Sequence, residues 1–96
     1  MVEYITNHGP PYVRATGNTQ SNAARRAFVE LIQRHDLDGI TIKRVHDLGG
    51  KPERLTESLH IDYTDADDTP HSLSAFSRAL DDEKTEWEVL LSDTFC

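Results

Sequence analysis

The 96-residue sequence predicts a small α+β fold with four strands and two helices in the order β-α-β-β-α-β. One observation is an apolar stripe at helical spacing after residue 20, and the other is a pair of alternating segments flanking a Gly-Gly turn. Two right-handed β-α-β crossovers around a central hairpin would give a ferredoxin-like two-layer sandwich, with a four-stranded antiparallel sheet and two helices on one face. Many unrelated functions share that architecture, so function has to be argued from particular residues.

The N-terminal third predicts the first strand and the first helix. Residues 2–6 and 12–15 are short extended segments, and we expect one or both to form the first strand. Thr19 or Ser21 can cap the helix that follows, and Asp36–Gly39 ends it. The residues that recur at helical spacing, and so predict its buried face, are Ala23, Ala24, Ala27, Phe28, Leu31 and Ile32.

The middle of the chain predicts a hairpin between residues 40–43 and 55–63, connected through Gly49-Gly50. Pairing positions whose numbers sum to 101 sets Ile40 opposite Ile61 and Arg44 opposite Glu57, so that apolar meets apolar and charge meets opposite charge. In this register His46 and His60 lie on opposite faces of the hairpin.

The C-terminal third predicts a second helix and a last strand. Thr69 and Pro70 are typical of an N-cap and a first helical position, and Leu73, Phe76 and Leu80 would face inward. Trp87, Val89 and Leu91 then alternate with Glu86, Glu88 and Ser92, which predicts a last strand with one apolar face.

Composition indicates a single domain with an unusual charge balance. Seventeen acids oppose ten bases, for a net charge of −7, and only three of the bases are Lys. Such a surface suits concentrated salt, which screens self-repulsion, so we expect a halophilic, archaeal or archaeal-virus source. The one cysteine, Cys96, permits no internal disulfide. With no signal peptide or apolar run long enough for a membrane span, we expect a soluble cytoplasmic or particle-borne protein with no membrane partner.

Residues 14–19, which join the extended segment to the first helix, are a candidate anion site. They resemble the phosphate loop of flavodoxins, which would imply flavin binding, but Arg14 stands where that loop carries Ser or Thr, and the chain is too short for the flavodoxin sheet. We therefore expect a turn and a helix cap here, and no cofactor. The basic helix start still leaves an anion- or nucleic-acid-binding function as an alternative, and its residues would be Arg14, Thr16, Gly17, Asn18, Thr19, Arg25 and Arg26. The acidic surface disfavours nucleic acid.

The predicted outward face of the hairpin is the candidate interface. Its residues would be Thr41, Lys43, Val45, Thr56, Ser58 and His60. A surface with so few charges on so acidic a protein favours contact with another subunit or partner. The five histidines lack the spacing of a metal site, and no nucleophile is marked by a strained turn or a Gly-rich loop, so we expect no metal and favour a protein that is not an enzyme. The leading hypothesis is a non-catalytic association module, as a homo-oligomer or as a component of a larger complex or viral particle.

Overall fold

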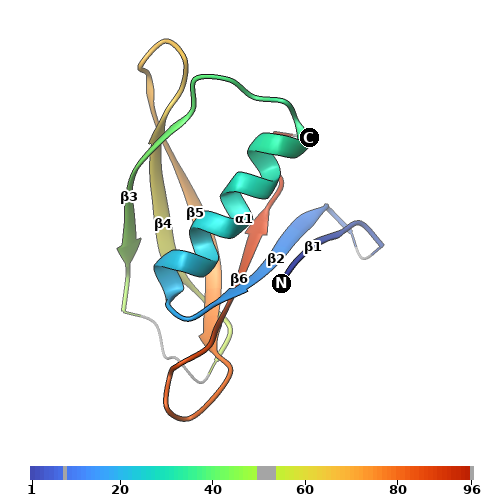
Figure 1. The fold of residues 1–96 in the computed structure, drawn as a ribbon, viewed down its shortest axis with the longest axis vertical. Helices are drawn as coiled ribbons and strands as arrows, with labels where there is room; N and C mark the ends of the chain where they lie inside the picture. Colours follow the sequence, from blue (N-terminus) through green and yellow to red (C-terminus); the bar gives the residue numbers. More distant parts are fainter. Residues whose placement is uncertain (8, 50–53, 96) are drawn as a thin grey trace.

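The computed structural model describes residues 1–7, 9–49 and 54–95, and in them it shows a six-stranded sheet with one helix on one face (Figure 1). Every neighbouring pair of strands is antiparallel, and the spatial order is β1-β2-β6-β5-β4-β3. The elements are β1 (Val2–Ile5), β2 (Tyr12–Gly17), α1 (Gln20–Arg34), β3 (Thr41–Asp47), β4 (Thr56–Thr64), β5 (Pro70–Ala79) and β6 (Trp87–Ser92).

The predicted ferredoxin-like sandwich is wrong, because the segment expected to be the second helix is strand β5 and the sheet has six strands. The sequence of β5 also fits a period of two. Ala75 and Ser77 are buried on the α1 side, whereas Phe76 and Arg78, which alternate with them, are exposed on the other side. Serine is a weak helix former, and β4 and β6 both offer unpaired edges to this segment, so strand pairing overrides the Thr-Pro helix signal.

Helix α1 confirms the apolar stripe. Its N-cap is Thr19, whose side-chain oxygen accepts a hydrogen bond from the Asn22 N–H at 3.0 Å. Five residues of the stripe are buried: Ala23, Ala24, Ala27, Phe28 and Leu31. Three of these five are alanines, so the first half of α1 can approach the sheet closely. Gly17 serves the same approach, because a Cβ there would lie 2.9 Å from the Ala23 backbone nitrogen.

The hairpin of β3 and β4 is present, but its predicted register is wrong. The structure pairs Val45 with Ile61 and His46 with His60, a shift of five relative to the predicted sum. A bulge between Ile42 and Arg44 lets both Ile42 and Val45 pack against the core, although they are three residues apart. Strict alternation cannot anticipate such a bulge. The expectations for Gly50, in the turn between these strands, and for Cys96 lie outside the described residues.

The core lies between α1 and the sheet. Its residues are Val13, Ala15, Ala23, Ala24, Ala27, Phe28, Leu31, Leu59, Ile61, Tyr63, Ala75, Val89 and Leu91. Figure 1 looks along the shortest dimension, onto the sheet face that α1 crosses. The opposite face, which we call the open face, carries no helix of the described chain and extends along the two longer dimensions, 41 and 29 Å.

Candidate functional site

The open face carries a row of four side chains that run across its four inner strands. Strand pairing sets Arg14 of β2 beside Leu90 of β6, Leu90 beside Phe76 of β5, and Phe76 beside Glu57 of β4. We call these four residues the central row. Their neighbours along the strands, such as Val13, Val89 and Ala75, are buried on the α1 side, so the central row points away from α1. The row therefore places two apolar side chains between a base and an acid.

A shallow apolar groove surrounds the middle of the central row. Its volume is about 330 Å³, and it is lined by Pro10, Tyr12, Leu55, Phe76, Leu90 and Ser92. Phe76 is 44% exposed and Leu55 is 38% exposed. Apolar side chains that gather on one face are more informative than scattered ones, because large contiguous apolar patches mark interaction surfaces.

Glu88 of β6 is nearly buried on the open face between two arginines. Its side chain is 5% exposed, and its two oxygens accept hydrogen bonds from Arg14 Nε and, at 2.8 Å, from Arg78 Nε. Arg14 also reaches Glu3 of β1 at 3.3 Å. This network neutralises the acid without a covering layer, so the open face can meet an apolar surface without burying an unpaired Glu88 charge.

The residues predicted as an interface are divided between the two faces. His60 lies on the open face opposite His46, and Thr41 and Lys43 are exposed on edge strand β3. Val45 packs against the core, and Ser58 is 2% exposed and hydrogen-bonded to Ser77. Thr56 Oγ1 is buried, and it has no hydrogen-bond partner in the part of the chain that the structure describes. A second bulge, between Glu57 and Leu59, explains why both Ser58 and Leu59 face inward.

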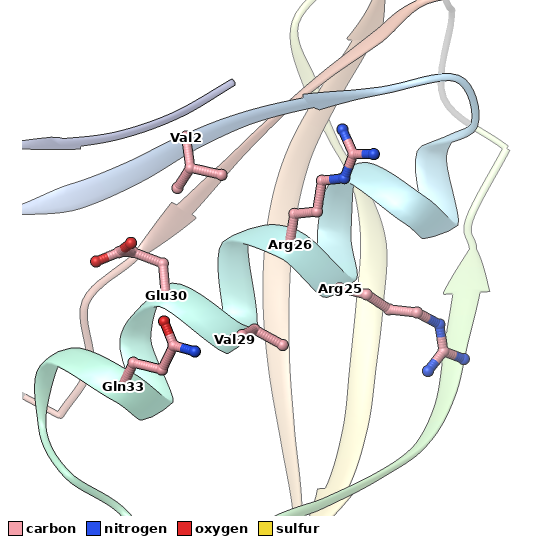
Figure 2. A pocket seen from close by; sticks show the side chains of 6 residues that line it. All are labelled: Val2, Arg25, Arg26, Val29, Glu30 and Gln33. Carbon is pink, nitrogen blue, oxygen red and sulfur yellow. The ribbon is translucent and has the colours of Figure 1, made fainter.

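The residues predicted as an anion site do not form one cluster. Arg14 is on the open face and is held by Glu88 and Glu3. Arg25 and Arg26 are on the exposed side of α1 and point in different directions (Figure 2). Both line a hollow of about 310 Å³ between α1 and the start of β1, together with Val2, Val29, Glu30 and Gln33.

The start of α1 gathers the remaining predicted anion residues. Thr16, Gly17 and Asn18 line a polar hollow of about 550 Å³ together with Asn22, Arg26, Thr85 and Glu86. Within it, Arg26 donates a hydrogen bond from Nη1 to the Thr16 carbonyl oxygen at 2.9 Å. Thr19 caps the helix, as described above. Arg26 and Glu86 therefore bring both signs of charge to this hollow.

A second polar cluster links the C-terminal end of α1 to β1 and to the segment after β6. The Asp93 side chain is fully buried and accepts a 2.6 Å hydrogen bond from the Tyr4 hydroxyl. His35 Nε2 lies 2.8 Å from Asp93 Oδ2, and the Phe95 N–H donates to Oδ1. Burial raises the pKa of the Asp93 carboxyl, but these hydrogen bonds outweigh it and hold that pKa below its usual value. These hydrogen bonds therefore connect the end of α1, strand β1 and the segment after β6.

The register of β3 and β4 also creates a histidine–aspartate contact on the open face. His46 hydrogen-bonds through Nε2 to Asp62 and lies opposite His60 in the neighbouring strand. The hydrogen bond from His46 is the main reason that the pKa of Asp62 lies below its usual value. The predicted register had placed the two histidines on opposite faces, so this cluster could not be anticipated.

The sequence reasoning also missed the residues that dominate the open face. Phe76 was predicted to lie on the inward side of a helix, and Glu88 was interpreted only as a residue on the polar side of the last strand. The alternation of residues 72–79 was the signal that could have exposed Phe76 and Arg78 on the same face.

Comparison with protein-family models, with curated proteins and with solved structures finds no match for this chain. Among residues 1–7, 9–49 and 54–95, no group of three or more His, Cys, Asp or Glu side chains could hold a metal ion. Helix α1, with 15 residues, is too short and too polar to cross a membrane, and the described chain has no other helix.

Proposed function

We propose that this chain is a non-catalytic association module that binds a protein surface through the open face of its sheet, as a homo-oligomer or as a component of a larger assembly. The observation that carries the proposal is the apolar middle of the central row, Leu90 and Phe76, within a groove that α1 does not cover. A sheet with one face exposed commonly alternates apolar inward and polar outward residues, and this face departs from that rule at its centre.

The size of the molecule and the distribution of its acidic residues also support this proposal. The molecule measures 41 and 29 Å along the two directions that the open face follows, which leaves room for the ~800 Å² that a stable partner covers on each side. Many of the acids lie in connecting segments rather than on this face: Asp36, Asp38, Asp65, Asp67, Asp68, Asp81, Asp82, Glu83 and Glu86. A partner on the open face would therefore avoid the most acidic parts of a chain whose net charge is −7.

The anion- or nucleic-acid-binding alternative has weaker support, because Arg14 is already paired with Glu88 and Glu3 on the other face. It would depend on Arg26 and the loop before α1. That alternative predicts binding of phosphate or DNA with a steep salt dependence that Arg26→Ala abolishes.

The test of the proposal is capture of partners from an extract of the source organism on immobilised protein. Three baits are compared: wild type, Phe76→Asp on the open face, and Val29→Asp as a control on the outer side of α1, where Val29 is 43% exposed. We expect wild type and Val29→Asp to retain the same partner, the chain itself included, and Phe76→Asp to lose it. Equal retention by all three baits would contradict the proposal.

A further inference from the structure

The central row has a pattern that is complementary to itself. Across β2, β6, β5 and β4 it reads base, apolar, apolar, acid: Arg14, Leu90, Phe76 and Glu57. When a second copy of the row is placed opposite the first in reversed order, each apolar residue faces the other apolar residue of the second copy. The base of each copy then faces the acid of the other. A surface with this property fits a copy of itself.

A twofold axis parallel to the strands, between β5 and β6, performs this reversal. Rotation about such an axis keeps each position along the strands and exchanges β6 with β5 and β2 with β4. Leu90 of one copy then faces Phe76 of the other, and Arg14 faces Glu57. Stacked sheets keep their strands within about 30° of each other, so rows near the axis stay opposite one another.

The neighbouring row satisfies the same operation. Strand pairing places Glu88 of β6 beside Arg78 of β5, so the rotation sets Glu88 of one copy against Arg78 of the other. Within each copy Glu88 is already paired with Arg14 and Arg78. The second copy therefore brings a compatible charge to each of these positions, and in these two rows no acid faces an acid.

Resting on the proposed function, we infer that the partner of the open face is a second copy of this chain, packed sheet to sheet about that axis. The dimer would have four layers, with the two helices outside and the two central rows in the middle. Glu57 and Arg14 fix the relative position of the copies, while Phe76 and Leu90 supply the apolar contact. The acidic connecting segments then lie at the rim, where salt screens the repulsion between two chains of charge −7.

The first measurement is mass in solution, by light scattering during size exclusion, over a range of protein concentrations in low and in molar salt. We expect twice the chain mass of 10.9 kDa, with tighter association in molar salt. A wild-type protein that stays monomeric at millimolar concentration in both salts would overturn the inference. The proposed function would survive that result if Phe76→Asp still loses a captured partner.

Charge variants test the arrangement itself. Glu57→Arg places two arginines opposite each other at both ends of the row, and we expect at least about tenfold weaker dimerisation in low salt. Asp67→Arg makes the same change in net charge on the exposed β4–β5 loop and should not weaken the dimer. Equal dimerisation by the two variants would overturn the inferred register even if wild type is a dimer.

A mixing experiment provides the most specific evidence. Arg14→Glu chains should also dimerise poorly alone, because Glu then faces Glu57. An equimolar mixture with Glu57→Arg chains should restore a dimer of unlike chains, since both contacts then join opposite charges. Failure of the mixture to associate, with both variants folded by circular dichroism, would overturn the inference. Should Arg14→Glu not fold, because Arg14 supports Glu88, the comparison of Glu57→Arg with Asp67→Arg decides the question.

Discussion

The two faces of the sheet use the same strands for different purposes. On β6, Val89 and Leu91 are fully buried beneath α1, whereas Glu88 and Leu90, which alternate with them, point to the open face. The covered face is stabilised by apolar contact with one helix, and on the open face the nearly buried Glu88 is paired with two arginines. The difference shows that α1, rather than the sheet, determines which side chains become core, and it separates residues needed for folding from residues available for binding.

The largest effect on stability is expected beneath α1. Phe28 is fully buried and packs against Tyr63 with ring centroids 4.9 Å apart. Phe28→Ala should lower the free energy of unfolding by about 3–5 kcal/mol, measured by urea denaturation. Val29→Ala, the next residue but exposed, should change it by less than about 0.5 kcal/mol. Similar losses for the two variants would mean that α1 is not the covering layer.

The second largest effect on stability is expected at Asp93, whose carboxylate is buried. Asp93→Asn should cost roughly 2 kcal/mol at neutral pH, because hydrogen bonds from Tyr4 and His35 to a charged acceptor are weakened. The pKa of Asp93 is lower in the folded chain than in the unfolded chain, so its contribution is present above pH ~4 and is lost as pH falls through the folded pKa. Thermal unfolding from pH 7 to pH 3 should therefore show wild type and variant converging at the acid end. A constant gap across that range would contradict this assignment.

The charge network of the open face should matter less. Glu88→Gln leaves Arg14 and Arg78 close together without the acid between them, and we expect a loss of about 1–2 kcal/mol in urea denaturation. The matched control is Glu86→Gln, two residues earlier and exposed, with an expected change below about 0.5 kcal/mol. If Glu88→Gln leaves the free energy of unfolding unchanged, the network is not needed to hold β2, β6 and β5 together.

The smallest effect on the isolated chain is expected at Phe76. Phe76→Ser should cost less than about 1 kcal/mol in dilute solution, because the side chain is 44% exposed. If the open face associates, the melting temperature of wild type should rise with protein concentration and that of Phe76→Ser should not. Parallel concentration dependence in both proteins would argue against an interface at this residue.

The predictions from sequence were accurate where a signal is local. The stripe from Ala23 to Leu31 predicted α1 because helical spacing depends only on nearby residues, and Thr19 was among the expected caps. The alternation around Val89 likewise predicted β6. The residues of the open face were anticipated only in part. The predicted interface included His60 and the predicted anion site included Arg14, whereas Phe76, Leu90 and Glu88 were in neither set.

The sequence by itself therefore determined the helix, the hairpin of β3 and β4 and the apolar face of the last strand, because these follow from periodicity and capping within a few residues. Only the tertiary structure decided that residues 70–79 form a strand, since that choice depends on pairing with β4 and β6. It also decided the register at the two bulges, which reverse the facing of Val45 and Ser58. The tertiary structure also decided on which side of the sheet Arg14 meets Glu88. These residues are 74 positions apart, so their contact depends on how distant segments pack around one core.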